Sequence, residues 1–274
     1  MSYKSILVHV QPDPHTHPRL DCAAALARNL DAVLFGLAAE MIPASGVADP
    51  YGFLEGQWIV AMREQLDKNL QTSEQVFGKA TSGLKTDWRA VMDYPTKAMA
   101  RAARAADLVV AGGAPLHGQE AYRACDLGEL VVTCGRPVLV APPSGGTLQA
   151  KRVVLAWKDT REARRAAIDA LPFLQKADEV LVQEVCRQDD AEAAEFQTGE
   201  VVRHLERHGV KARAAVVVAP DDRAAAELKQ AAQALGADLI VAGGYGHNRM
   251  SEWVFGGVTR EFLSDPDRFV LLCH

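Results

Sequence analysis

The stretches AADLVVAGG (residues 105–113) and GADLIVAGG (residues 236–244) match at all but two positions and lie 131 residues apart. Each joins an apolar run of strand length to a pair of glycines. Two further pairs keep a similar spacing, because SILVHVQPD from Ser5 aligns with RVVLAWKDT from Arg152, and GRPVLVAPP from Gly135 aligns with DRFVLLCH from Asp267. A period of this length is too long for a solenoid repeat. The sequence therefore predicts two copies of one domain, at residues 1–143 and 151–274.

The chain has the composition of an ordinary globular protein. Its 274 residues are 49% hydrophobic and 24% charged, which excludes disordered and fibrous classes. The net charge of -5 argues against a general nucleic-acid or membrane-surface role, because those partners select basic faces. The N-terminus shows no signal-peptide pattern, and no apolar run approaches a length of about 18 residues. We therefore expect a cytoplasmic protein that binds neither nucleic acid nor a membrane.

Cysteine and histidine positions indicate no structural framework. The five cysteines are widely spaced and include no C-x-x-C pair, so neither a disulfide network nor a zinc site is predicted. Buried, reduced thiols are the simpler interpretation. The eight histidines are similarly scattered.

Within each copy, short β-branched runs alternate with helical patterns, which is typical of βαβ units and a parallel sheet. In the first copy the predicted strands are residues 5–10, 32–38, 86–92, 108–111 and 137–141. In the second copy they are residues 153–157, 179–185, 212–218, 239–242 and 269–273. We therefore predict an α/β fold with two tandem Rossmann-like domains, each an open, doubly wound, mainly parallel five-stranded sheet flanked by helices.

Helices of the second copy can be placed from apolar spacing. Apolar positions between Ala163 and Leu174 fall on one face of a helix after the first strand, and Asp159 with Glu162 predicts a capping box at its start. Further helices are predicted at residues 191–208 and 223–235. The first copy is about 16 residues longer between its first and fourth strands. Residues 43–56 are the predicted insertion, either a solvated loop or a lid or partner-docking segment.

The loop VAGGYGHNRMSEWVFGGVT (residues 241–259) begins at the carboxyl end of a predicted strand. Ligands of open parallel sheets bind at such ends. Gly256 and Gly257 open a helix whose first amides favour an anion, and glycines let phosphate oxygens reach the main chain. The chain has no G-x-x-x-x-G-K-[ST], and Gly244 and Gly246 lack the third glycine of the dinucleotide fingerprint. A phosphate site of another kind is predicted.

These residues resemble the universal stress proteins. Nucleotide-binding members of that family carry glycine, two residues, glycine, nine residues, then glycine and a serine or threonine. Gly243, Gly246 and Gly256 fit that spacing and are followed by Gly257, Val258 and Thr259. The resemblance covers essentially the whole chain, as two domains in tandem.

The resemblance implies an adenine nucleotide, ATP or else ADP or AMP, with or without magnesium. Its phosphates would lie on Gly243, Gly246, Gly256, Gly257 and Val258, and its adenine near the ends of the first and second strands. Tandem members look like a fused dimer whose fifth strands pair, here residues 137–141 and 269–273. Family analogy also implies a homodimer of two-domain chains and a regulatory protein partner.

Two positions depart from the family pattern. Gly257 stands where the family has serine or threonine, and Thr259 is the candidate to replace that hydroxyl. Lys158 stands where relatives have an adenine-contacting aspartate, so either Asp159 takes that role, or Lys158 turns to the phosphates, or Lys158 is only solvated. Trp157 either stacks on adenine or is buried between sheet and helix.

The remaining loop residues and the first copy complete the site prediction. His247 and Arg249 contact phosphates or a partner chain, or else form a polar loop surface. The first copy has Pro115 and Cys125 at the positions of the second and third glycines. One nucleotide site per chain, in the second copy, is therefore predicted.

Three functions stay open on the sequence. The leading one is a regulatory protein that senses or stores an adenine nucleotide and acts through protein contacts. No nucleophile with a base, paired carboxylates or metal cluster converges on the loop, so catalysis is not the default. A slow ATPase that uses Lys158, Asp159 or His247 is one alternative. A nucleotide-free interaction scaffold is the other.

Overall fold

The computed structural model describes residues 2–13, 15–42, 53–112, 122–245, 257–264 and 266–274. The strands of the first half are β1 (Ser5–His9), β2 (Val33–Glu40), β3 (Thr86–Met92), β4 (Leu108–Gly112) and β5 (Val138–Ala141). Its helices are α1 (Thr16–Leu30), α2 (Phe53–Ala80), α3 (Pro95–Ala102) and α4 (Leu127–Thr133). All predicted strands of this half are present, with ends within two residues of the prediction.

The second half repeats this order, again with predicted strand ends within two residues. Its strands are β6 (Arg152–Trp157), β7 (Glu179–Cys186), β8 (Ala212–Val218), β9 (Leu239–Gly243) and β10 (Phe269–Cys273). Its helices are α5 (Arg161–Asp169), α6 (Leu171–Leu174), α7 (Ala191–Arg207), α8 (Ala224–Leu235) and α9 (Gly257–Ser264). The α/β fold of two similar halves is therefore confirmed.

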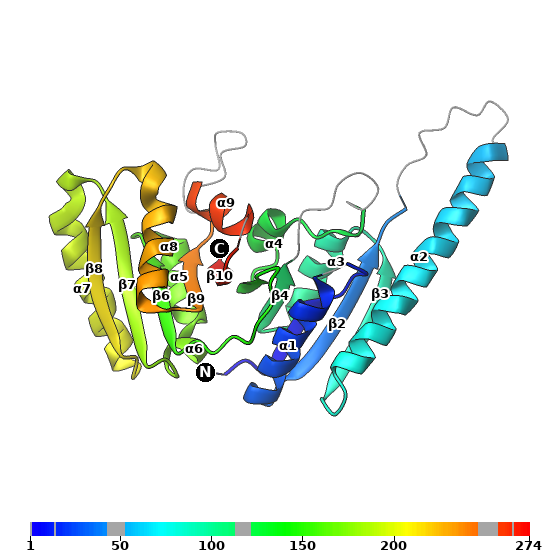
Figure 1. Cartoon of the computed structure of the whole chain (residues 1–274), viewed down its shortest axis with the longest axis horizontal. Coiled ribbons are helices and arrows are strands. Elements are labelled where there is room, and N and C mark those ends of the chain that lie inside the picture. Colours follow the sequence, from blue (N-terminus) through cyan, green and yellow to red (C-terminus); the bar gives the residue numbers. More distant parts are fainter. Residues whose placement is uncertain (1, 14, 43–52, 113–121, 246–256, 265) are drawn as a thin grey trace.

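The two halves share one ten-stranded sheet in the order β3-β2-β1-β4-β5-β10-β9-β6-β7-β8 (Figure 1). Neighbouring strands are parallel within each half. The seam between β5 and β10 is antiparallel, with Val140 opposite Val270 and Leu139 opposite Leu271. The expected pairing of the fifth strands thus occurs within one chain. It covers two apolar edges that would otherwise be open to aggregation.

Helices cover both faces of the sheet, and each face has its own core. Side chains of α1, α2, α5, α6 and α7 pack with one set of strand residues, which includes Leu155 and Val182. Side chains of α3, α4, α8 and α9 pack with the alternate set, which includes Ala156 and Leu181. This alternation follows from the two-residue period of a strand. Burial on both faces explains why the central strands are continuously apolar.

Two local predictions differ from the structure. The cap of α5 is Thr160, whose Oγ1 accepts a hydrogen bond from Ala163 N at 3.2 Å, so the predicted capping box at Asp159 is wrong by one residue. Residues 43–52 of the predicted insertion at residues 43–56 lie outside the described residues. Its last residues, 53–56, begin α2, which has 28 residues against 17 in α7. Part of the extra length of the first half is therefore helix.

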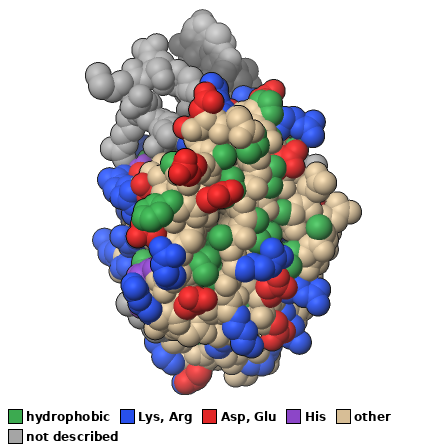
Figure 2. Space-filling model, turned by 90° about the vertical axis from the view of Figure 1, so that its left-hand side faces the viewer, with side chains coloured by type: hydrophobic (Ala, Val, Ile, Leu, Met, Phe, Trp, Pro, Cys, Tyr) green, Lys and Arg blue, Asp and Glu red, His purple; other side chains and the backbone are tan. Residues whose placement is uncertain are grey.

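Charge on the face that includes the β8 edge is mixed. Lys and Arg side chains alternate with Asp and Glu side chains there (Figure 2). This face thus carries no extended basic patch of the kind that nucleic acid selects. Across the described part of the chain, no helix has both the length and the apolar character needed to cross a membrane.

Candidate functional site

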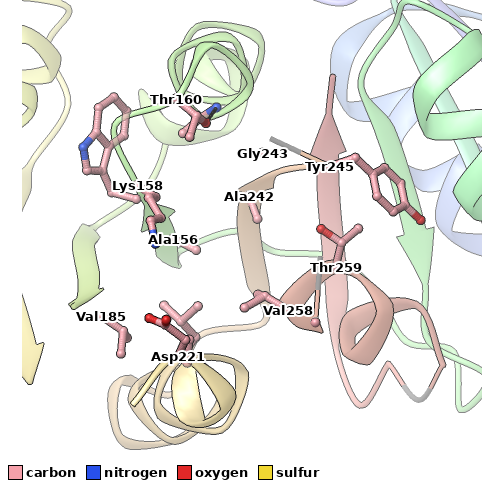
Figure 3. A pocket seen from close by; sticks show the side chains of 15 residues that line it. Ala156, Lys158, Thr160, Val185, Asp221, Ala242, Gly243, Tyr245, Val258 and Thr259 are labelled. Carbon is pink, nitrogen blue, oxygen red and sulfur yellow. Dashed lines mark hydrogen bonds between the residues drawn. The ribbon is translucent and has the colours of Figure 1, made fainter. Parts of the chain in front are cut away.

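The carboxyl ends of β6 and β9 lie side by side where the strand order of the second half reverses. The sheet continues through β7 and β8 on one side of β6 and through β9 and β10 on the other. Such a switch point leaves a crevice in an open parallel sheet. Here it is a cavity of about 390 Å3, lined from the ends of β6, β7 and β9, from α8, and from the starts of α5 and α9 (Figure 3). We call it the β6/β9 crevice.

Most of the described residues that the sequence singles out line the β6/β9 crevice. These are Trp157, Lys158, Gly243, Gly257, Val258 and Thr259. Asp159 is not among the lining residues, because its carboxylate is paired with Arg164, Oδ1 to Nη2, at 2.6 Å. The predicted residues Gly246, His247, Arg249 and Gly256 lie outside the described residues.

The two described motif glycines have different surroundings. A Cβ on Gly243 would lie 2.6 Å from the backbone nitrogen of Ala163 and 2.8 Å from the carbonyl carbon of Glu162. Glycine at this position thus allows the start of α5 to approach the end of β9. A Cβ on Gly257 would meet nothing within 4 Å among the described residues. The described residues therefore leave space open beside Gly257, whereas the space at Gly243 is already filled by α5.

The start of α9 supplies donors to the crevice. The helix begins at Gly257, and Val258 and Thr259 of its first turn also line the cavity. The first amides of a helix have no partner within the helix and carry partial positive charge. Thr259 is buried, and its side chain points into the cavity in Figure 3. An anion beside Gly257 would meet these donors.

Lys158 adds a full positive charge to the same cavity. Its side chain extends from the end of β6 into the crevice, and Asp221 faces it from the turn before α8. Lys158 is exposed and makes no ion pair with any residue that the structure describes. The Asp221 carboxylate accepts a hydrogen bond from Arg187 Nη2 at 2.6 Å. Lys158 is thus available to a ligand.

The residues that follow β9 connect the crevice to the first half of the molecule by packing against α4. Gly244 N donates to Cys273 O at 2.7 Å, and a Cβ on Gly244 would lie 2.8 Å from Val131 of α4. Tyr245 has a left-handed backbone, with φ of 61°. Burial and the charge of Asp126, the cap of α4, raise the pKa of Tyr245 to about 12. The start of the glycine loop, at Gly244 and Tyr245, therefore packs against α4.

Comparison with known proteins identifies the fold. No protein-family model and no curated protein matches this sequence. A solved universal stress protein from Archaeoglobus fulgidus DSM 4304 superposes with a TM-score of 0.70 and 15% identity, covering 98% of this chain and 95% of that chain. This chain has the universal stress protein fold. The expected resemblance is thereby confirmed along nearly the whole chain.

Two structures from Pseudomonas aeruginosa agree with this fold. A putative universal stress protein from strain UCBPP-PA14 gives a TM-score of 0.61 at 18% identity and covers 99% of this chain and 93% of that chain. A functionally unknown protein from strain PAO1 gives 0.60 at 17% identity, with coverage of 99% and 92%.

In the first copy of the universal stress fold, the corresponding strand ends are occupied by a side chain of the protein itself. Arg19 of α1 donates through Nε to His9 O at 2.8 Å and through Nη1 to Gly112 O. Its Nη2 pairs with Asp13 at 2.9 Å, and the two side chains are 1% and 3% exposed. Because β1 and β4 end at His9 and Gly112, the guanidinium lies where the second copy has its crevice.

Sequence reasoning missed several of these residues. Thr160 and Asp221 line the crevice but belong to no motif, and Tyr245 lines it from a position that the glycine motif leaves unspecified. Asp221 follows the end of β8, so the rule that ligands bind at strand ends could have found it. Arg19 also left a signal, because alignment of Ser5 with Arg152 places it opposite Ala166, on the buried stripe of the matching helix.

Proposed function

We propose that the protein is a stress-response regulator that binds an adenine nucleotide, ATP in the first place, in the β6/β9 crevice and acts through protein contacts. The observation that carries this proposal is the space beside Gly257 that the described residues leave open, in a cavity that the start of α9 and the ammonium group of Lys158 also line. Both groups favour the phosphates of a nucleotide. In this proposal residues 151–274 form the nucleotide-binding domain and residues 1–143 form a second domain.

The size and lining of the crevice fit this ligand class. Its volume of about 390 Å3 lies in the range of roughly 300 to 1,000 Å3 that is common for small-molecule sites. Ala156, Val185 and Leu228 supply apolar wall for a base ring. Hydrogen bonds to charged groups contribute roughly 1.5 to 3 kcal/mol each. A few of them with a buried ring reach about -8 kcal/mol, which is a micromolar affinity.

The proposal assigns one nucleotide to each chain. Arg19 and its partners occupy the matching position of the first copy. Within the described residues, no group of three or more His, Cys, Asp or Glu side chains could hold a metal ion. Magnesium would therefore bind chiefly through the phosphates and water, which is its usual manner with nucleotides. We further propose a cytoplasmic homodimer with a regulatory protein partner.

A slow ATPase is the second candidate function. Lys158 lines the crevice and is placed to stabilise charge on a phosphoryl group. Asp159 is engaged by Arg164 outside the crevice, which leaves Lys158 as the stronger of the two candidates. Release of inorganic phosphate from ATP that Lys158→Gln abolishes and Lys158→Arg retains would favour this function. A nucleotide-free scaffold is the third candidate.

Calorimetric titration tests nucleotide binding. ATP, ADP and AMP, each with and without magnesium, are titrated into protein stripped of nucleotide. We expect about one site per chain with a dissociation constant near micromolar for ATP. No heat change at several temperatures, together with no nucleotide in the protein as isolated, would rule out nucleotide binding. The nucleotide-free interaction scaffold would then be the remaining candidate function.

A matched pair of variants locates the site. Gly257→Glu and Gly257→Gln place side chains of the same size in space that the described residues leave open. An acidic group at a helix start also stabilises the helix, so folding should be retained. The carboxylate should weaken ATP binding more than about tenfold relative to the amide, because like charges would meet at the phosphates. Equal ATP affinities in the two variants would contradict the placement of the phosphates at the start of α9.

A further inference from the structure

A second cavity lies between α5 and α7. It has a volume of about 490 Å3. Trp157, Ala167, Ile168 and Val201 give it apolar walls, and Asp159, Arg164, Gln197, Glu200 and His204 give it a polar rim. Trp157 is the residue that it shares with the β6/β9 crevice. We call it the α5/α7 groove.

Two buried polar groups beside the groove lack hydrogen-bond partners among the described residues. Trp157 is 8% exposed and Glu184 is 6% exposed. Trp157 Nε1 and Glu184 Oε2 make no hydrogen bond within the described part of the chain. The two residues lie directly opposite each other in the β6–β7 ladder, on the same face of the sheet. A buried donor or acceptor without a partner costs about 1 to 3 kcal/mol, so a ligand that meets these groups would bind favourably.

The rim of the groove favours a positively charged ligand. Asp159 and Glu200 are both carboxylates, and Arg164 is already paired with Asp159 at 2.6 Å. Glu200 makes no ion pair with the residues that the structure describes. An indole face also attracts cations through its π electrons. An indole side chain and an exposed carboxylate without an ion pair among the described residues therefore line one groove, and the buried indole N–H has no hydrogen-bond partner among those residues.

We propose that the α5/α7 groove binds a small aromatic ammonium compound that carries a hydrogen-bond acceptor. The ring packs against Trp157, Ile168 and Val201, the ammonium group pairs with Glu200, and the acceptor receives the hydrogen of Trp157 Nε1. This site goes beyond the nucleotide function and does not depend on it. Its shared wall, Trp157, places it next to the crevice.

Three related probes separate the parts of this recognition. Tyramine has the ammonium group and a phenolic oxygen that can accept. Phenethylamine lacks the oxygen, and 4-hydroxyphenylacetate replaces the ammonium group by a carboxylate. Titration followed by ligand NMR should give the tightest binding for tyramine and the weakest for 4-hydroxyphenylacetate. No tyramine binding at its solubility limit, or equal binding of the carboxylate, would overturn the proposal.

Variants of the full chain place the probe in the groove. Glu200→Gln should weaken tyramine binding about two- to fivefold, because an exposed ion pair is lost. Glu206→Gln, on the exposed surface of α7 and outside the groove lining, is the matched control and should leave it unchanged. Trp157→Phe should weaken tyramine about fivefold and abolish its advantage over phenethylamine. If Glu200→Gln and Glu206→Gln bind tyramine equally well, the groove is not the site.

Discussion

His9 ends β1 with a buried imidazole whose Nε2 has no hydrogen-bond partner among the described residues. Burial, followed by the charge of Arg19, lowers the pKa of His9 to about 3. The folded protein therefore holds this ring neutral, whereas the unfolded chain protonates it below about pH 6.5. Part of the stability of the fold thus depends on pH through one residue.

The sign of this dependence follows from proton binding. Below about pH 6.5 the unfolded state binds a proton at His9 that the folded state does not, so the free energy of unfolding falls as pH falls toward the folded pKa. We predict that the wild-type protein loses about 1 kcal/mol per pH unit from His9 between about pH 6 and about pH 4. The His9→Gln variant should lack this part of the slope.

Urea unfolding at a series of pH values measures the effect. His204→Gln, at an exposed histidine of α7, is the control and should follow the wild-type slope more closely than His9→Gln does. Parallel stability curves for the wild type and His9→Gln would contradict the prediction, because they would show that both states titrate His9 alike.

At the scale of elements, Gly243 decides how closely β9 and α5 pack. A Cβ there would lie 2.6 to 2.9 Å from atoms of Glu162 and Ala163, mostly backbone. The motif glycine thus has a packing role that a phosphate-binding spacing does not reveal. Sequence reasoning placed Gly243 correctly at the end of a strand, but it could not weigh the approach of α5, which depends on tertiary contacts.

Alanine substitutions at the two glycines should therefore differ. Gly243→Ala should lower the free energy of unfolding by about 1 to 3 kcal/mol, because overpacked backbone has to move. Gly257→Ala adds the same methyl group at a helix start, where no described residue lies within 4 Å of it, and should be neutral or slightly stabilising. Denaturant unfolding of both variants measures this difference. Equal stabilities would contradict the packing role of Gly243.

Across the whole molecule, the repeat predicted most of the architecture. The matching stretches at β4 and β9 located both halves, and apolar runs located every strand of the sheet. The pairing of β5 with β10 was predicted from the family resemblance, and the structure confirms it. The hydrogen bonds of Arg19 to the carbonyl groups of His9 and Gly112 were not predicted. An arginine on a predicted helix does not indicate which strand ends it will contact until the strands are placed together. Asp159 was wrongly predicted as the cap of α5, because aspartate and threonine are both common N-cap residues and Thr160 follows directly.

Residues predicted from the position of a strand end lie at the crevice, whereas the direction of a side chain just past that end could not be predicted from the sequence. Lys158 and Asp159 are adjacent in the sequence, yet Lys158 enters the crevice and Asp159 pairs with Arg164 in the neighbouring groove. Residues just past a strand end lack the regular alternation of the strand. Only the folded structure distinguishes the direction of Lys158 from that of Asp159.

Photolabelling with azido-ATP tests whether the β6/β9 crevice holds the nucleotide, because it reports where on the chain a nucleotide lies. We predict one label per chain that excess ATP suppresses, on peptides containing the end of β6, the end of β7 or residues 221–224. Gly257→Glu should reduce this labelling more than Gly257→Gln. Label that ATP suppresses on the first half around Arg19, or no label that ATP suppresses anywhere, would contradict the assignment of the nucleotide to the β6/β9 crevice.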